Sequence, residues 1–385
     1  MKIRVLALCV LALFCQNTLA LEHIRFMHNR LERNEEGKVL AEDRRGLDFL
    51  ARDGQAYHIT WDNVITRRSD DMPFVPYTKP EMIERLRQEF PPSEGFHFLD
   101  AHAYGPFVVV YTTSRDFANW YARLLQRLYE QYNAHWNRRR VELSAPEFPL
   151  VAIVLSNKER FRQFARLDGV NILDEQCAYY HKLTNRIVVY DMSGMQTFRE
   201  GDRRRMGTMA FLMKPEAEGN IRTVVHEAVH QVGFNTGIHP RFVDSPVWVY
   251  EGLAVFHEVP DQRNRDLGWS LGPHLNQPRL LHLRRYLSRL LSAPTVQRPI
   301  QAMITDDRLL SNSATALDNY ALAWGLFYYL ERTRSQELAA YLKLLQSKTA
   351  TSEDSPEIRI ADFESCFGND WDRLYREFAD YIRRL

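Results

Sequence analysis

The segment from Pro246 to Glu258 constrains the fold more than any other, because it is a helix-like run that is apolar on most faces. Ser245 followed by Pro246 is a favourable helix start, with serine as the cap and proline at the first helical position. A helix that is apolar nearly all round must be buried. Glu251 lies within it, and a buried, ionised carboxylate needs a partner. Gly252 is costly inside a helix and predicts close approach of a second helix.

The preceding segment offers such a partner, because it reads His226-Glu227-x-x-His230. Histidines at positions i and i+4 project from one face of a helix, so both imidazoles can reach one tetrahedral zinc ion. Glu227 lies beside them, where it can act on a water at the open zinc position. Gly237 is a typical stop for this helix. The alternative interpretation is a helix with two surface or capping histidines, and a third ligand such as Glu251 argues against it.

Glu258 lies seven residues beyond Glu251, nearly two helical turns, and therefore shares its face. From there its carboxylate could orient one of the zinc-bound histidines. The alternative is an ordinary surface glutamate at the end of the helix.

His-Glu-x-x-His on one helix, followed by Trp248-x-x-Glu251-Gly252-x-Ala254 on the next, resembles the gluzincin metallopeptidases of the thermolysin and M1 aminopeptidase type. The fuller run looks closest to bacterial peptidase-MA-like families of unknown function. The resemblance covers roughly residues 107–385 in layout, with its specific motifs within 223–258. It implies one Zn²⁺ ion held by His226, His230 and Glu251, with Glu227 as catalytic base.

Further expectations follow from this resemblance. M1 enzymes stabilise the oxyanion with a tyrosine from a helix well downstream of the glutamate ligand, and Tyr320 lies at a comparable remove. The alternative is that Tyr320, Trp324 and Tyr328 form an aromatic stripe at helical spacing, which is typical of a core. The chain lacks the Gly-x-Met-Glu-Asn-type exopeptidase element, which favours endopeptidase action or an unusual substrate.

Other interpretations of the site and its function remain open. His226 to Gly233 also fits the start of a metzincin signature, which needs a third histidine at the position of Thr236; His239, three residues further on, is the alternative ligand. The same centre could hydrolyse a non-peptide substrate, or belong to a catalytically silent metal-containing binding protein. A purely structural zinc is disfavoured, because such sites usually close with four protein ligands.

Residues 1–20 have the layout of a secretory signal peptide: a basic start, an apolar stretch from Val5 to Cys15, and small residues up to Ala20. We therefore expect an exported protein, secreted or periplasmic, without stable membrane insertion. Cleavage after Ala20 removes two of the 50 basic residues and none of the 49 acidic ones, which leaves a net charge of −1. This balance does not point to nucleic acid, and the expected partner is a peptide or protein substrate. No oligomeric state is predicted.

The pattern along the chain predicts an α+β protein. A gluzincin-like catalytic domain, with a mixed sheet and the His-Glu-x-x-His helix, follows a small β-rich N-terminal region and precedes an α-helical C-terminal lobe. The predicted boundaries are residues 21–105 for the β-rich region and linker, 106–260 for the zinc-binding lobe, and 261–385 for the helical lobe. The expected strands are Lys38–Glu42, Leu47–Arg52, Ala56–Thr60, Phe107–Thr112, Leu150–Leu155 and Arg186–Tyr190. The expected helices are 81–90, 116–136, a helix capped by Ser156, the two site helices, 279–292, 315–333, 336–347 and 369–384.

Two further features are left open by the pattern. Arg186–Tyr190 could be an edge strand along which an extended peptide lies. Cys177 and Cys366 could pair in an oxidising compartment or remain two buried thiols.

Overall fold

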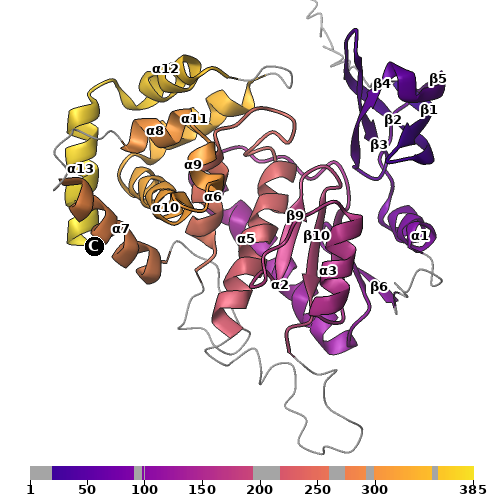
Figure 1. The fold of residues 1–385 in the computed structure, drawn as a ribbon, viewed down its shortest axis with the longest axis horizontal. Helices are drawn as coiled ribbons and strands as arrows, with labels where there is room; N and C mark the ends of the chain where they lie inside the picture. The colour runs from indigo at the N-terminus through magenta and orange to yellow at the C-terminus, as the bar shows by residue number, and fades with distance from the viewer. Residues whose placement is uncertain are drawn as a thin grey trace, which may run out of the picture. The chain divides into compact units, whose positions relative to one another are not determined.

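A computed structural model gives the structure of the protein for residues 20–90, 98, 100–193, 217–259, 274–291, 299–348 and 354–385. The chain divides into two compact units, Met1–Pro76 and Tyr77–Leu385 (Figure 1). The expected signal peptide lies outside the described residues except for Ala20. None of the described helices is long and apolar enough to cross a membrane.

The first unit is an antiparallel sheet with the strand order β4-β3-β2-β1-β5. Its strands are β1 (Ala20–His28), β2 (Leu31–Glu42), β3 (Gly46–Ala51), β4 (Ala56–Thr60) and β5 (Val64–Pro73). The three strands expected in this region are confirmed as β3, β4 and the end of β2. Gly54 has a φ of 85°, which accounts for the turn between β3 and β4. β5 was not expected, because most of its side chains are exposed and show no apolar alternation.

The second unit contains a mixed sheet with the strand order β6-β7-β8-β10-β9. Its strands are β6 (Asp100–Tyr104), β7 (Phe107–Tyr111), β8 (Leu150–Leu155), β9 (Ala178–His181) and β10 (Arg186–Tyr190). The parallel strands β7, β8 and β10 are continuous apolar runs because helices cover both of their faces. The expectation that Arg186–Tyr190 is an edge strand is wrong. β10 pairs with β8 on one side and with β9 on the other, so β9 forms this edge of the sheet.

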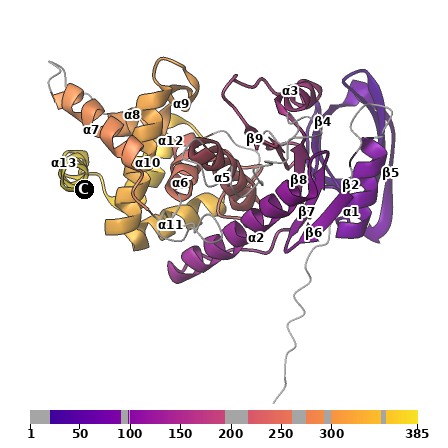
Figure 2. The same ribbon diagram turned by 90° about the horizontal axis from the view of Figure 1, so that it is seen from below.

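Helices cover the two faces of this sheet. α1 (Lys79–Glu89) and α3 (Lys158–Leu167) pack on one face, and α2 (Arg115–Arg138) and α5 (Ala217–Asn235) pack on the other (Figure 2). Ser114 caps α2, and Asn157, not Ser156 as expected, caps α3. α1 and β6 lie in the segment expected to be part of a linker ending at residue 105. They belong to the second unit, because they pack on and pair with β7.

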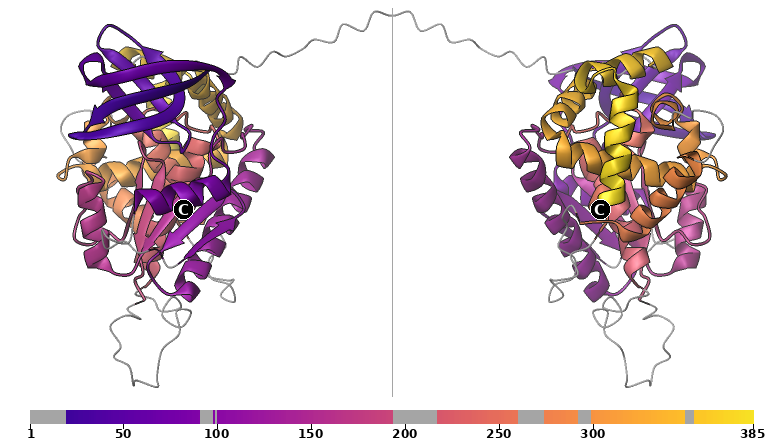
Figure 3. Two further views of the ribbon diagram at one scale, coloured as in Figure 1. Left: turned by 90° about the vertical axis from the view of Figure 1, so that its right-hand side faces the viewer. Right: turned by 90° about the vertical axis from the view of Figure 1, so that its left-hand side faces the viewer.

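Helices dominate the chain after β10. α6 (Val247–His257) packs between α5 and α10 (Ala316–Thr333). Around them lie α7 (Gln277–Leu291), α8 (Pro299–Thr305), α9 (Arg308–Ser311), α11 (Ser335–Gln346), α12 (Pro356–Phe367) and α13 (Trp371–Arg384) (Figure 3). The expected helices of this region are confirmed as α7, α10, α11 and α13. One hydrophobic core runs from the sheet through α5 and α6 into these helices, so the two expected lobes share a core within one unit.

The two cysteines retained after the expected cleavage do not form a disulfide. Cys177 is a buried thiol just before β9 and donates to the carbonyl oxygen of Asn220 at 3.4 Å. Cys366 lies on α12 and is also free.

Two contacts with segments distant in the sequence fix the position of α6, one at Gly252 and one at the N-terminus of the helix. At Gly252, an added Cβ would lie 2.7 Å from the carbonyl oxygen of Ala323 in α10, so the expected close helix approach is confirmed. At the N-terminus, the amide of Val247 donates to the carboxylate of Asp307 at 2.9 Å. Ser245 does not cap the helix as expected; its hydroxyl is buried without a hydrogen-bond partner among the described residues.

Replacing Gly252 with alanine should lower the free energy of unfolding by about 1–3 kcal/mol, because the methyl group meets backbone that cannot move without shifting α10. Gly219→Ala is the matched control, because nothing lies within 4 Å of the Cβ added there. Urea denaturation of the metal-free proteins gives the comparison. Equal midpoints for the two variants would contradict the close packing of α6 on α10.

Candidate metal centre

The helix α5 presents one functional face. His226, His230 and Phe234 follow each other at intervals of four residues, so their side chains lie one above another. The apolar faces of the helix are buried, through residues such as Val225 and Val229. Gly237, with a φ of 82°, lies two residues after the last helical residue, Asn235, and ends the helix as expected. α5 is therefore fixed by its apolar faces while its histidines remain available for chemistry.

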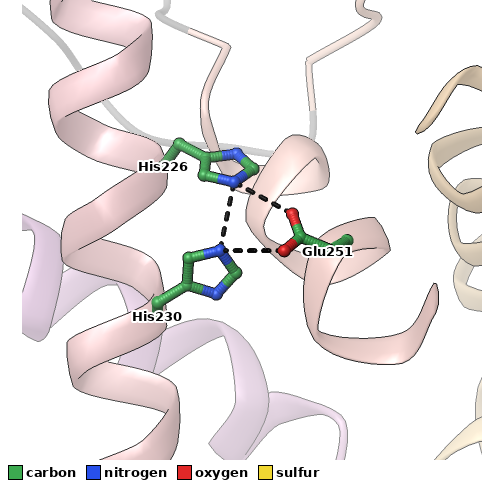
Figure 4. Close-up of side chains that lie close together, drawn as sticks. All are labelled: His226, His230 and Glu251. Carbon is green, nitrogen blue, oxygen red and sulfur yellow. Dashed lines mark hydrogen bonds and ion pairs between the residues drawn. The ribbon is translucent and has the colours of Figure 1, made fainter. Parts of the chain in front are cut away.

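Glu251 reaches this face from α6, and its carboxylate points between the two imidazoles (Figure 4). Its Oε2 lies 3.1 Å from Nε2 of His226, and its Oε1 lies 3.6 Å from Nε2 of His230. The two Nε2 atoms lie 3.1 Å from each other. His226, His230 and Glu251, called the trio below, are the group of side chains among the described residues that could together hold a metal ion.

The spacing of these atoms fits a tetrahedral metal ion. Ligand atoms about 2.0–2.2 Å from a tetrahedral zinc ion lie roughly 3.3–3.6 Å from one another. The three separations, 3.1, 3.1 and 3.6 Å, fall close to this range. Two imidazole nitrogens and a carboxylate are also a donor set that zinc accepts. The residues present therefore fit a single divalent ion of this type.

The pKa values of Glu251 and His226 depend strongly on the charges of their neighbours. Burial raises the pKa of Glu251, but the two neighbouring histidines outweigh it and hold this pKa well below its ordinary value. Burial lowers the pKa of His226, yet its contacts with Glu251 and Glu258 raise it well above the ordinary value. The carboxylate is therefore kept ionised in a largely buried position, which is the state that binds a cation.

Glu258 orients His226 from the side opposite to Glu251. Its Oε2 lies 3.1 Å from Nδ1 of His226, and its Oε1 accepts a hydrogen bond from Nδ2 of Asn276 at 3.0 Å. Because an ionised carboxylate only accepts, Nδ1 carries a hydrogen, which leaves Nε2 as the nitrogen that would bind a metal ion shared with Glu251 and His230. Glu258 is buried, so the alternative of an ordinary surface glutamate does not hold.

Glu227 lies beside the trio and is held by the edge strand of the sheet. Its Oε2 accepts a hydrogen bond from the backbone amide of Tyr180 in β9 at 2.9 Å. Burial raises the pKa of Glu227, and the charges of His226 and His230 reduce this effect without cancelling it. A carboxylate with a raised pKa is a stronger base than an exposed glutamate.

Tyr320 departs from the aromatic stripe to which its spacing assigns it. Trp324 and Tyr328, on the same helix, are buried in the core, whereas Tyr320 is only partly covered. Burial raises the pKa of Tyr320, and the nearby carboxylates of Glu251 and Glu227 raise it further. Its hydroxyl group therefore lies in the field of the metal centre.

His239 lies outside the trio. Its ring packs against Phe234 and Tyr250, with centroid separations of 5.8 and 6.3 Å. Neither ring nitrogen has a hydrogen-bond partner among the described residues, and burial lowers its pKa to about 3. The alternative ligand set that uses His239 is not assembled.

Sequence reasoning missed two residues of this centre. Tyr180 acts through its backbone amide, and the identity of a residue does not show what its amide contacts. The run Ala178-Tyr179-Tyr180, before the turn at Asn185, could only have indicated a strand. Asn276 contacts Glu258 from the start of α7, and nothing in the spacing predicts this contact.

The comparisons with known proteins add one match. The model of a family described as a protein of unknown function (DUF1570) matches residues 220–352, about a third of the chain. The matched range includes the trio, Glu227, Glu258 and Tyr320. No curated protein matches the chain.

Replacing Glu258 with glutamine should weaken zinc binding by roughly tenfold to a hundredfold, because a neutral amide polarises His226 less than the carboxylate does. Glu337→Gln changes an exposed glutamate on α11 and serves as the control. Competition with a zinc-binding dye measures both dissociation constants. An affinity in Glu258→Gln equal to that of the control would show that Glu258 does not support the metal centre.

Proposed function

We propose that this chain is an exported zinc-dependent peptidase of the gluzincin type, with one zinc ion held by His226, His230 and Glu251. The proposal rests on the convergence of these three side chains at separations that fit a tetrahedral ion, with Glu227 beside them. The resemblance of the two helical motifs to gluzincins supports the same interpretation.

Three protein ligands leave a position for water and substrate. A zinc ion bound there would make a bound water more acidic and polarise the substrate carbonyl group. Glu227 would accept the proton of the attacking water and later deliver it to the leaving amine. The hydrogen bond from Tyr180 fixes the direction in which the Glu227 carboxylate points during both transfers.

β9 supplies the proposed site for the peptide backbone. It pairs with β10 along one side, and the amide of Tyr180 faces away from β10 toward Glu227. An extended peptide could add to this edge and be brought beside the general base. This role passes from Arg186–Tyr190, where the sequence suggested it, to the adjacent strand.

Tyr320 is the proposed hydrogen-bond donor for the oxyanion. Its raised pKa keeps the hydroxyl group protonated, which is the form able to donate. Its place on α10, which packs on α6, ties this donor to the helix that carries Glu251.

Replacing Glu227 with glutamine should lower peptide cleavage by about 100-fold to 10,000-fold, because glutamine accepts the Tyr180 hydrogen bond but cannot take a proton. Zinc content by elemental analysis should remain one ion per chain in the wild type and in the variant. Glu159→Gln, on an exposed position of α3, is the control and should cleave normally.

Each contrary result removes a different part of the proposal. Zinc in both proteins without cleavage of a broad peptide library by either would overturn peptidase action and leave a non-peptide substrate or a binding role. No zinc in the reconstituted wild-type protein would overturn the metal centre itself.

Replacing Tyr320 with phenylalanine should lower kcat by about 100-fold to 1,000-fold with little change in zinc affinity, because one oxyanion donor is lost. Tyr328→Phe removes the same hydroxyl group from a core position of the same helix and should keep its activity. Steady-state kinetics on a single cleaved peptide provide the test. Equal kcat values for the two variants would return Tyr320 to the structural role that its spacing suggests.

A further inference from the structure

Lys182 places a positive charge close to the metal centre. It follows β9 in the turn to β10, and its Nζ atom lies 4.9 Å from the ring centroid of Phe234. Phe234 is four residues after His230 on α5, and its ring also stacks with that of Tyr180 at 5.9 Å. The ammonium group therefore lies against the aromatic ring that follows His230 one helical turn later on the same face of α5.

This ammonium group is partly buried without an anionic partner. In the part of the chain that the structure describes, Lys182 has no carboxylate within 4.0 Å. The charge of Asp244 acts on it, but that carboxylate accepts hydrogen bonds from Arg359 at 3.0 Å and from the backbone amide of Asp354 at 2.9 Å. A contact with an aromatic ring offsets only part of the cost of covering an ammonium group.

Arg241 adds a second positive charge. Its guanidinium group donates to the backbone carbonyl oxygens of Lys182 and Leu183, each at 2.6 Å, and so fixes the turn. Burial lowers the pKa of Lys182, and the charge of Arg241 lowers it further. An anion bound beside Lys182 would relieve both effects, because it favours the charged ammonium form.

We propose that Lys182 binds a carboxylate group of the substrate, so that the enzyme selects acidic peptides. This inference rests on the proposed peptidase function. Positions 180 and 182 lie two residues apart, and both side chains contact Phe234. A peptide lying along β9 beside Tyr180 would therefore bring a nearby side chain or its end to Lys182. The carboxylate belongs either to an acidic side chain or to the C-terminus of the peptide.

Cleavage of two peptide sets distinguishes these sources. One set carries Asp or Glu at each position in turn and has an amidated C-terminus, and the other has no acidic side chain and a free C-terminus. The wild-type enzyme should prefer the peptides whose carboxylate lies at one fixed distance from the cleaved bond. Lys182→Ala should lower kcat/KM for these peptides by roughly tenfold to a hundredfold, the size expected for a hydrogen bond to a charged group, and leave the others unchanged.

Further variants separate charge from folding. Lys182→Arg should keep the preference, and Lys182→Glu should shift it to peptides with Lys or Arg at the same position. Lys343→Ala, at an exposed lysine of α11, is the matched control and should behave as the wild type. The inference would be overturned if the wild type, Lys182→Ala and Lys182→Glu all preferred the same peptides. Zinc-dependent cleavage by these proteins would still support the proposed peptidase function.

A wild-type protein that cleaves neither set overturns the proposed function, and binding then decides the inference. Fluorescence anisotropy of labelled peptides from both sets, with the zinc-loaded protein, gives the measurement. Selective binding of acidic peptides that Lys182→Glu abolishes would retain a carboxylate site at Lys182. Equal binding by the wild type and by Lys182→Glu would remove it.

Discussion

The contact between the Glu251 carboxylate and two imidazoles sets conditions for the rest of the second unit. An ionised carboxylate in an apolar helix is costly unless opposite charge or a metal ion compensates it. Here the compensation comes from α5, so α5 and α6 must lie side by side with His226 and His230 facing Glu251. α10 then packs on the other side of α6, where Gly252 permits close contact. The core between the sheet and the C-terminal helices is built around this arrangement.

The centre also links parts of the protein with different tasks. Glu258 and Asn276 hold His226 from one side, while the edge strand β9 holds Glu227 from the other. The proposed general base is thus oriented by the sheet, and the proposed metal ligands are positioned by helices. A substrate along β9 would be presented to both, and Lys182 lies at the end of that strand.

Local spacing explains which features could be predicted from the sequence. His226, Glu227 and His230 lie within little more than one helical turn of each other, so their spacing is visible in the sequence. Glu251 lies in an apolar run whose burial follows from its composition. The strands β3, β4, β8 and β10 are similarly visible as short apolar or alternating runs. Contacts between distant segments leave no such pattern, which is why the amide of Tyr180, Asn276 and the Asp307 cap of α6 were missed. The edge position was misassigned because the four-residue strand β9 lies outside the more apolar β10.

The anchoring of α6 has a consequence for the order in which the chain becomes functional during its synthesis. Asp307 caps the helix that carries Glu251, and Arg359 pairs with Asp307 at 2.7 Å and with Asp244 at 3.0 Å. Arg359 lies 115 residues after Asp244, so these supports are synthesised long after the two histidines and Glu251. A nascent chain that emerges N-terminus first therefore carries its histidines well before the framework that aligns Glu251 with them. Alignment of the proposed centre is thus coupled to completion of the polypeptide, which would delay capture of a metal ion until nearly the whole chain has emerged.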